Sequence, residues 1–412
     1  MMKKRIALIL IMTLVAVLTT ACNLNVNQND PEIKNWDLLT KSATGSTITI
    51  AVDHSNPLVV TWLKEDFSDY LKLNYEMTVK IIDQPLIKTL DELSKDKASE
   101  VELGTYDIIL FEGEGFKKAF EKGLLYGPFT DKLMDVKTLL DTDSLEYLTH
   151  EGISTQNYTI PYGRNQLSFI YNQDVFYETP VDFDAFIELI STYKGQFTYP
   201  DPRKSLEGEA FVLSVVGQDI DLEPYSSGTV DKAKFISAIQ PGIDKLKAMK
   251  SNLKDNGTTY PQSTQALDDL FNNGSLIMSM SMSYNYATDK LKEYEYPEGA
   301  STFVVPSGMA TFTEVAGIAF NSVNKSGAMV ALNALVSPDM QASKYDPKAW
   351  GSLPVYTQDV TSDTAFEALK KVKVKSTTVK YKDFVECAMP EFSPALRTIV
   401  IEQWEKQVLQ GK

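Results

Sequence analysis

The stretch ITIAVDHSNPLVVTWLKEDF, residues 48–67, joins a strand directly to a helix. Apolar side chains alternate from Ile48 to Val52, which predicts a short strand. Asn56 then supplies a helix cap, and Pro57 takes the first helical position, where its missing N–H leaves no hydrogen bond unmade. This strand-to-helix unit indicates an α/β fold.

The same order recurs further along the chain. Residues 79–82 predict a second strand, and leucines at helical spacing over residues 86–93 predict a second helix. Residues 106–111 predict a third strand, and a helix follows over residues 116–120. This β-α-β-α-β order favours a parallel sheet with helices on both faces.

Polar residues follow the first and third predicted strands. In sheets of this kind, ligands bind beyond the carboxyl ends of the strands and against helix N-termini. The sequences DHSN (53–56) and EGEG (112–115) occupy those places. We therefore expect ligand contacts from Asp53, His54, Glu112 and Glu114.

The chain is too long for one hydrophobic core, since single cores stop growing at roughly 250–300 residues and this chain has 412. Two lobes are expected. The apolar run LSFIY (167–171) predicts a strand that crosses into a second lobe, and residues 183–193 predict a helix there. Residues 302–306 and 315–321 predict strands that return to the first lobe.

Methionines and serines alternate over residues 276–283. This period-two pattern places methionines on one face of a strand and serines on the other. Ser281, Tyr284 and Asn285 would then end the strand with groups that can hydrogen-bond a solute. A solvated strand end is an equal alternative.

The charge balance is acidic. Lys and Arg total 40, Asp and Glu total 55, and the formal net charge is −15. Without the three basic residues of the first 21, the chain has 37 basic and 55 acidic residues, a charge of −18. Such a field repels nucleic acid and anionic lipid, and it mainly indicates a solubilising surface.

The N-terminus has the layout of an export signal. Basic residues 3–5 precede the apolar run 6–18, which is too short to span a bilayer as an ordinary helix. The following sequence LTTAC resembles the lipobox of bacterial lipoproteins and implies that Cys22 is lipidated. We expect a signal peptide over residues 1–21, a lipidated tether over residues 22–44, and a lipid-anchored location on the extracytoplasmic face of the cell membrane.

Cysteine and histidine are scarce. The only cysteines are Cys22 and Cys387, so acylation of Cys22 leaves no intramolecular disulfide. Cys387 is expected to be a buried, small apolar side chain. His54 and His150 are the only histidines, which excludes a multi-histidine metal site and disfavours Ser-His and Cys-His dyads. We expect no metal and no cofactor, although an all-carboxylate cation site stays open.

Several blocks of sequence occur in an order that resembles a known family. They are YDIILFEGEGFK (106–117), GLLYGPFT (123–130), IPYGRNQLSFIYNQ (160–173), GQFTYPDPR (195–203) and YPQSTQALDDLFNNGSLIMSMSMSYNY (260–286), and the similarity continues over residues 328–353. Together they resemble the YnjB-like extracytoplasmic solute-binding proteins of ATP-driven (ABC-type) importers.

The resemblance implies the periplasmic-binding-protein type II fold, which is α/β and two-lobed. Each lobe is expected to hold a mixed, mostly parallel sheet flanked by helices, with the ligand cleft between the lobes. Lobe 1 would comprise residues 45–165 and 301–337, and lobe 2 residues 166–300 and 338–412. The resemblance also implies a non-enzymatic monomer that closes on a small solute and delivers it to an ABC permease and its ATPase.

The candidate ligand groups mix acids, tyrosines, amides and one arginine. Acids interleaved with tyrosines suit an organic cation, through ion pairing and cation–π contact, whereas Arg164 suits a carboxylate or phosphate on the same solute. A zwitterion would satisfy both. The full set is Asp53, His54, Glu112, Glu114, Tyr162, Arg164, Asn165, Tyr199, Asp201, Ser281, Tyr284 and Asn285.

Two enzyme classes are alternatives. Segments beginning at Ser251, Ser283 and Lys325 reproduce, in order, the three signatures of penicillin-recognising serine enzymes. Ser251 lies late in a predicted helix, whereas such a nucleophile lies at a helix start, so solute binding is favoured. The other alternative is a glycoside hydrolase that uses Glu112 and Glu114, which would need opposed carboxyl groups about 5 to 9 Å apart.

Overall fold

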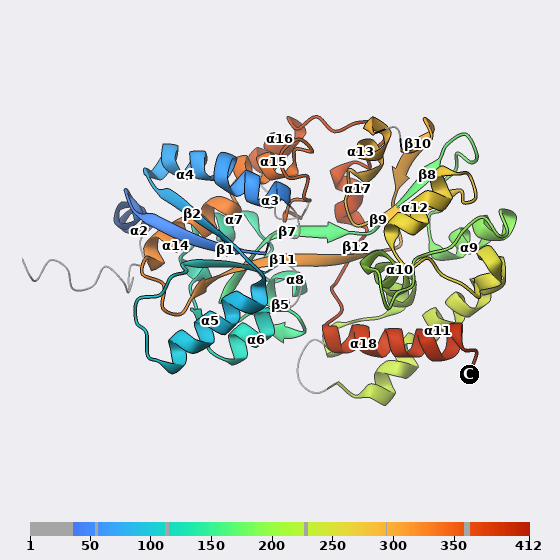
Figure 1. Ribbon diagram of the computed structural model, residues 1–412, viewed down its shortest axis with the longest axis horizontal. Coiled ribbons are helices and arrows are strands. Elements are labelled where there is room, and N and C mark those ends of the chain that lie inside the picture. Colours follow the sequence, from blue (N-terminus) through green and yellow to red (C-terminus); the bar gives the residue numbers. More distant parts are fainter. Residues whose placement is uncertain (1–35, 54–56, 112–114, 226–229, 294, 358–362) are drawn as a thin grey trace, which may run out of the picture.

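The protein forms two α/β lobes that lie side by side in the computed structural model (Figure 1). The structure describes residues 36–53, 57–111, 115–225, 230–293, 295–357 and 363–412. The lobe on the left of Figure 1 holds the larger sheet, and the lobe on the right holds the smaller sheet. The two-lobed α/β class predicted from the sequence is confirmed.

The three strands predicted near the N-terminus form the parallel part of the larger sheet. β1 (Thr47–Val52) pairs in parallel with β2 (Thr78–Asp83) on one side and with β3 (Ile108–Phe111) on the other. Every residue of β3 is buried, as expected for a strand that is covered on both faces. The predicted β-α-β-α-β order is therefore confirmed.

Helices cover this sheet from two sides. α3 (Pro57–Trp62) begins at the proline that the sequence places at the first helical position. In Figure 1, α3 and α4 (Ser68–Tyr75) lie above the strands, and α5 (Leu86–Ala98) and α6 (Phe116–Glu121) lie below them. The helices thus bury apolar side chains against both faces of the sheet.

A long antiparallel pair of strands runs between the lobes (Figure 1). β7 (Thr159–Gln166) pairs with β11 (Met309–Ala319), and β11 also pairs with β3 of the larger sheet. The register of this pair shifts between Glu314 and Val315, where Tyr162 is the extra residue on β7. Such a β-bulge bends a strand and redirects neighbouring side chains.

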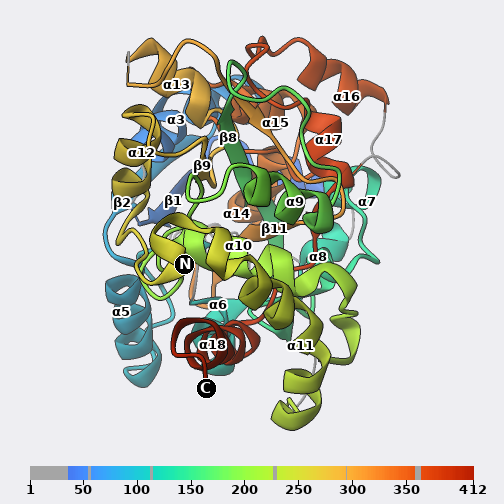
Figure 2. The same ribbon diagram turned by 90° about the vertical axis from the view of Figure 1, so that its right-hand side faces the viewer.

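The smaller sheet is built on β8 (Ser168–Asn172), with β9 (Met278–Ser281) and β10 (Ala300–Phe303) on its two sides. Aromatic side chains hold helices against it. The ring of Phe169 lies 4.9 Å from that of Phe186 and 6.1 Å from that of Phe211, between centroids. Figure 2 looks onto this lobe and shows α9 (Phe183–Thr192) and α10 (Leu206–Val216) on the near side.

The smaller sheet differs from the prediction in two respects. Its described strands are all antiparallel, whereas a mostly parallel sheet was expected. In addition, residues 302–306 are predicted to return to the first lobe, but β10 pairs with β8 instead. Phe303 stacks on Phe169 with ring centroids 5.1 Å apart, so apolar burial holds this strand in the smaller lobe. β11 makes the return.

The C-terminal third of the chain contributes to both lobes. α14 (Lys325–Leu335) packs against α2 (Trp36–Ala43) in the larger lobe, and α15 (Pro338–Tyr345) follows it. α18 (Pro394–Gln403) packs on α10 and on α11 (Lys232–Met249) in the smaller lobe (Figure 2).

Cys387 is buried, and burial raises the pKa of its thiol to about 12. The prediction that this residue is a buried, small apolar group is confirmed. Over the part of the chain that the structure describes, no helix has both the length and the apolar character needed to cross a membrane.

Candidate functional site

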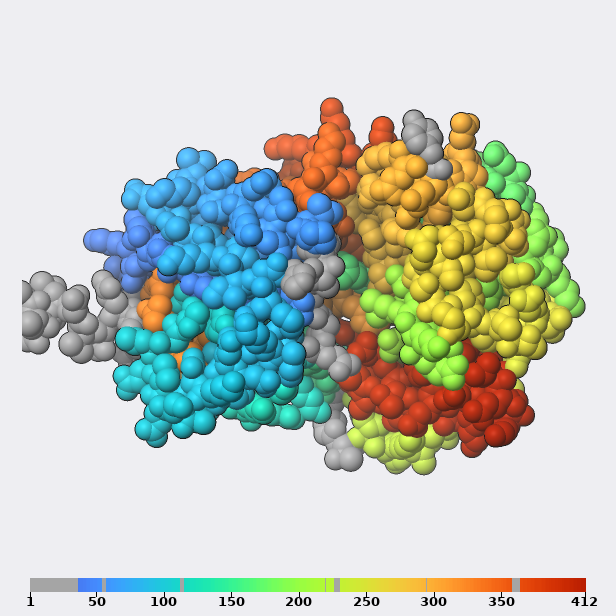
Figure 3. All heavy atoms as spheres, viewed as in Figure 1, coloured from blue at the N-terminus to red at the C-terminus, as the bar shows by residue number. Residues whose placement is uncertain are grey.

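A polar pocket of about 260 Å³ lies where the lobes meet, beside the β7–β11 pair. Figure 3 shows the molecular surface hollowed between the two lobes. We call this site the interlobe pocket. Side chains from both lobes and from the segment 347–352 line it: Leu58, Val59, Asn165, Ser283, Asn285, Asp289, Glu314, Pro347, Trp350, Gly351 and Ser352.

Glu314 places a carboxylate in the wall of this pocket. The residue is 7% exposed. Asn165 donates from Nδ2 to Oε1 of Glu314 at 2.9 Å, while Oε2 has no hydrogen-bond partner among the described residues. A buried polar atom without a partner costs stability, so an atom of this kind at a pocket wall marks a candidate ligand contact.

Lys344 lies behind the same wall. Its ammonium donates to Ser352 Oγ at 3.0 Å and to the Leu353 carbonyl at 2.9 Å. Gly163 provides the space in which these groups meet, because a Cβ there would lie 2.3 Å from Oε2 of Glu314 and 2.9 Å from Nζ of Lys344. A side chain at position 163 would therefore collide with both groups.

Burial controls the protonation of Glu314 and Lys344. It raises the pKa of the Glu314 carboxyl, and the positive charge of Lys344 partly opposes that rise. It also lowers the pKa of Lys344 to about 7, and the negative charge of Glu314 partly opposes that fall. A solute with its own positive charge would therefore favour the ionised carboxylate.

The opposite side of the pocket is lined by Asn285 and by Asp289 of α13 (Tyr286–Lys292). Asn285 donates to Oδ2 of Asp289 at 2.9 Å, and Lys292 pairs with Oδ1 at 2.8 Å. Asp289 is thus already paired within the protein. Trp350 supplies the aromatic part of the lining, and the Lys344 ammonium lies 5.3 Å from its ring centroid.

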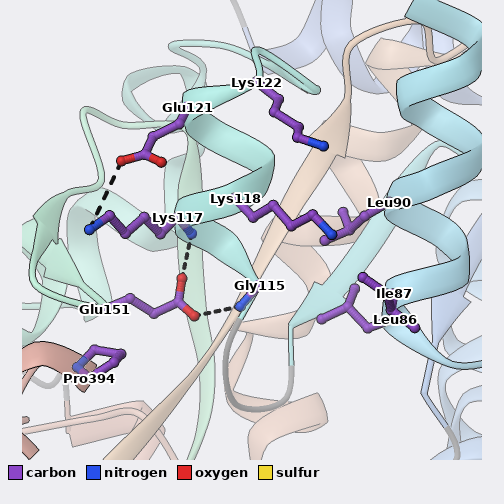
Figure 4. Close-up of a pocket in the computed structure, with 10 residues that line it drawn as sticks. All are labelled: Leu86, Ile87, Leu90, Gly115, Lys117, Lys118, Glu121, Lys122, Glu151 and Pro394. Atoms are coloured by element: carbon purple, nitrogen blue, oxygen red, sulfur yellow. Dashed lines mark hydrogen bonds and ion pairs between the residues drawn. The ribbon is translucent and has the colours of Figure 1, made fainter. Parts of the chain in front are cut away.

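A second hollow, of about 430 Å³, lies beside α5 and α6. Figure 4 shows its lining, in which leucine and isoleucine side chains of α5 face lysines of α6. Lys118 pairs with Asp91 at 3.9 Å, and Lys117 pairs with Glu121 at 4.0 Å. These two cations are therefore already matched by acids at the surface.

The chain's own carboxylates cap both of these helices. Asp53, which follows β1, accepts a hydrogen bond from the backbone N–H of Leu86 at 3.0 Å. Glu151 accepts from the backbone N–H groups of Gly115 and Lys117 at the start of α6 (Figure 4). Helix N-termini attract anions. At α5 and α6 the carboxylates of Asp53 and Glu151 already occupy those positions.

Arg164 binds protein atoms. Its guanidinium donates to the carbonyls of Pro354 at 2.9 Å and Tyr356 at 2.7 Å, and it lies 3.7 Å from Glu146. Burial opposes the positive charge of Arg164, but the negative charge of Glu146 and the contact with Tyr381 together outweigh it, so the pKa of Arg164 is raised. Arg164 is not among the pocket-lining residues, and it fastens β7 to the segment 353–356.

Tyr199 and Asp201 lie within the smaller lobe. The Tyr199 hydroxyl accepts a hydrogen bond from Nε1 of Trp404 at 2.9 Å, and its ring is fully buried. Asp201 pairs with Arg203 at 2.7 Å. The structure therefore does not bring these two predicted residues to the interlobe pocket.

Tyr162, Ser281 and Tyr284 lie close to the pocket but do not line it. Tyr162 is buried in the bulge of β7. Ser281 accepts from the backbone N–H of Ser283 at 3.0 Å, and the Tyr284 hydroxyl donates to a backbone carbonyl of α15. Among the described candidates, only Asn165 and Asn285 line the pocket.

Four further predicted residues lie outside the described residues. They are Cys22, His54, Glu112 and Glu114. Their roles stay predictions.

Sequence analysis did not identify Glu314, Asp289 or Trp350 as candidates. Glu314 had a usable signal, because it is the only charged residue in the strand MATFTEVAGIA (309–319). A charged side chain is rarely buried in a strand unless it is paired or has a function. Asp289 had no comparable signal, since it lies among the charged residues of an ordinary surface helix.

Of the three residues that begin the serine-enzyme signatures, only Ser283 lines the interlobe pocket. Ser251 lies in the short 3-10 helix Lys250–Asn252, and Lys325 is the first residue of α14. Within the described ranges, no group of three or more His, Cys, Asp or Glu residues could hold a metal ion.

Two α/β lobes with a polar pocket between them define the class of two-lobed solute-binding proteins. Solved structures share this fold over most of the chain. One, described as an extracellular solute-binding protein from Bordetella parapertussis, has a TM-score of 0.63 at 11% identity and covers 88% of this chain and 98% of that chain. Another, the spermidine/putrescine ABC transporter substrate-binding protein PotD from Streptococcus pneumoniae, has a TM-score of 0.57 at 13% identity, with 89% and 100% covered.

The family model for bacterial extracellular solute-binding proteins matches residues 67–374, so the chain belongs to this family. It is also 25% identical over 346 residues to Protein YnjB of Escherichia coli (strain K12), which covers 82% of this chain and 86% of that protein. The resemblance stated from the sequence is confirmed.

Proposed function

We propose that the protein is the solute-binding component of an ABC importer and captures one small polar solute in the interlobe pocket. The observation that carries this proposal is the pocket itself, because polar side chains of both lobes line one cavity at their junction. Capture requires no covalent chemistry. The bound form would be presented to a membrane permease and its ATPase.

The acids of the pocket support a cationic or zwitterionic solute. Glu314 and Asp289 both line it. An anionic solute would meet like charge at the wall.

The test of solute capture is a thermal-shift screen of the chain without its first 22 residues. The panel comprises vitamins, polyamines, amino acids and sugars. A solute present at 100 times its Kd should stabilise the folded chain by about 2.7 kcal/mol and raise its Tm. If no compound raised the Tm, solute capture in this pocket would be contradicted.

We also propose that Cys22 carries a lipid that holds the protein on the extracytoplasmic face of the membrane. The basis is the signal-like segment that ends at this cysteine. Cys22→Ser should move the protein from the membrane fraction to the soluble fraction, because a single unmodified tether gives no membrane affinity. Cys387→Ser is the matched control and should stay in the membrane fraction. Membrane retention of Cys22→Ser would contradict the anchor.

A further inference from the structure

The interlobe pocket contains one strong acceptor that the described protein leaves unused. Oε1 of Glu314 receives the Asn165 amide at 2.9 Å, but Oε2 is buried without a hydrogen-bond partner among the described residues. This oxygen lies beside Gly163, where a Cβ would be 2.3 Å from it, and the Glu314 side chain lines the pocket. The pairing of β11 with β7 fixes the position of Glu314. Its unpaired Oε2 is therefore a fixed part of the protein around the pocket.

We propose that the solute is a compact ammonium or guanidinium compound and that its cationic group donates an N–H hydrogen bond to Oε2 of Glu314. This inference rests on the proposed function and specifies the class of solute. It assigns the recognition of charge to a residue of β11, in the middle of the β7–β11 pair.

The need for an N–H follows from the acceptor. A buried carboxylate oxygen is satisfied only by a donor, and charge-assisted bonds to carboxylates are about twice as strong as neutral ones. A quaternary ammonium carries positive charge without an N–H and would leave Oε2 unsatisfied. The site therefore distinguishes amines from their fully methylated counterparts.

The need for positive charge follows from the neighbours of Glu314. Lys344 is the cation behind the wall, but Ser352 and Leu353 take two of its hydrogens. Asp289 adds a second acid to the lining. A neutral alcohol could donate to Oε2 but would add no positive charge beside the Glu314 carboxylate, whereas Asp289 already pairs with Lys292.

The pocket also limits size. Its volume of about 260 Å³ is at or below the usual range for drug-sized ligands, which begins near 300 Å³. Ser283, Asn285 and Ser352 line the remaining wall and can hydrogen-bond the polar part of the solute. A short, polar amine fits this combination of charge, volume and lining.

The first measurement is calorimetric titration with a matched panel. Ethanolamine, putrescine, agmatine and arginine are each compared with a counterpart in which methyl groups replace the N–H hydrogens or a hydroxyl replaces the amine. At least one amine or guanidine should bind, and its counterparts should bind at least about 30-fold more weakly. If no amine or guanidine binds, or if the methylated or neutral counterpart binds as tightly, the assignment is overturned.

The second measurement uses Glu314→Gln, which keeps an acceptor for Asn165 and removes the negative charge. It should weaken the binding of the amine at least about 30-fold, and the free variant should melt close to wild type, because glutamine has nearly the same shape as glutamate and keeps the hydrogen bond from Asn165. The control, Glu188→Gln on the exposed face of α9, should leave affinity unchanged.

The outcomes separate the two proposals. Affinity retained in Glu314→Gln would overturn the assigned solute class while solute capture stands. A large fall in Tm of the free variant would indicate that Glu314 is a structural residue and would also overturn the assignment. A complete absence of binding by every compound of the wider screen would contradict the proposed function itself.

Discussion

Lys344 and Glu314 are both removed from water, yet the protein satisfies them unequally. Lys344 has two acceptors within 3.0 Å, whereas one oxygen of Glu314 has no donor among the described residues. Burial disfavours the charged form of each group, which is why the pKa of Lys344 falls to about 7 while that of Glu314 rises. Stability should therefore depend on pH in a way that ordinary surface residues do not produce.

Lys344→Met tests this dependence. Between about pH 7 and pH 10.5, the unfolded chain keeps the lysine proton while the folded chain has lost it. The unfolded state then binds more protons, so the free energy of unfolding of wild type should rise with pH across this window. The variant should lack this contribution, as measured by urea unfolding at several pH values.

Lys348→Met is the matched control, because this lysine lies on the exposed side of the same segment. It should keep the pH dependence of wild type. Parallel pH curves for wild type and Lys344→Met would contradict the lowered pKa.

At this scale, sequence analysis predicted residue types better than contacts. Asn165 and Asn285 line the pocket as predicted, but the Arg164 guanidinium donates its hydrogen bonds to the carbonyls of Pro354 and Tyr356. Those carbonyls lie almost two hundred positions away in the chain. No local pattern shows which distant backbone groups a buried arginine will satisfy.

Helices and strands are the next scale, and here the acid caps of α5 and α6 matter most. Glu151 reaches α6 from a different part of the chain and binds two backbone N–H groups (Figure 4). Gly115, the residue before the helix, has a φ of 142°, a conformation that L side chains rarely adopt. The start of α6 therefore depends on one remote acid and one glycine.

Glu151→Ala should lower the free energy of unfolding by about 1 to 2 kcal/mol, the usual cost of losing a helix cap. Glu121→Ala is the matched control at the other end of α6, where the acid is exposed and its ion pair with Lys117 is long, at 4.0 Å. The control should change stability by less than about 0.5 kcal/mol. Equal losses measured by urea unfolding would show that Glu151 does not act as a cap.

Element positions were predicted well where apolar periodicity is strong. The strands β1, β2, β3, β8 and β9 and the helices α5 and α9 lie where the sequence pattern places them. The pairing partner of a strand was harder to predict, as β10 shows. An isolated apolar run such as residues 302–306 carries no information about which sheet it joins. The aromatic contact of Phe303 with Phe169 makes that choice, and it exists only in the folded lobe.

The whole molecule is expected to work by closure of its two lobes over the interlobe pocket. Because side chains of both lobes line that pocket, a bound solute stabilises the form in which both contact it. The two-lobed class followed from chain length and the order of elements. The pairing of β7 with β11 across the molecule could not be predicted, because it joins distant segments.

Closure should shorten the distance between the lobes when solute binds. Thiol labels at Leu73→Cys in the larger lobe and Tyr177→Cys in the smaller lobe report this distance, since both positions are well exposed. Cys22→Ser is combined with them, and Cys387 is buried. Labels at Leu73→Cys and Leu103→Cys, both in the larger lobe, serve as control. An unchanged interlobe distance at saturating solute would contradict closure.

The position of β11 in the sequence affects how the protein folds while it is being synthesised and exported. β11 is the neighbour of β3 in the larger sheet, yet the whole smaller sheet lies between them in the chain. A chain that leaves a ribosome or passes through an export channel from its N-terminus offers β3 long before its partner exists. The larger sheet therefore stays incomplete until most of the polypeptide has emerged, and the edge of β3 stays unpaired and open to aggregation during that interval.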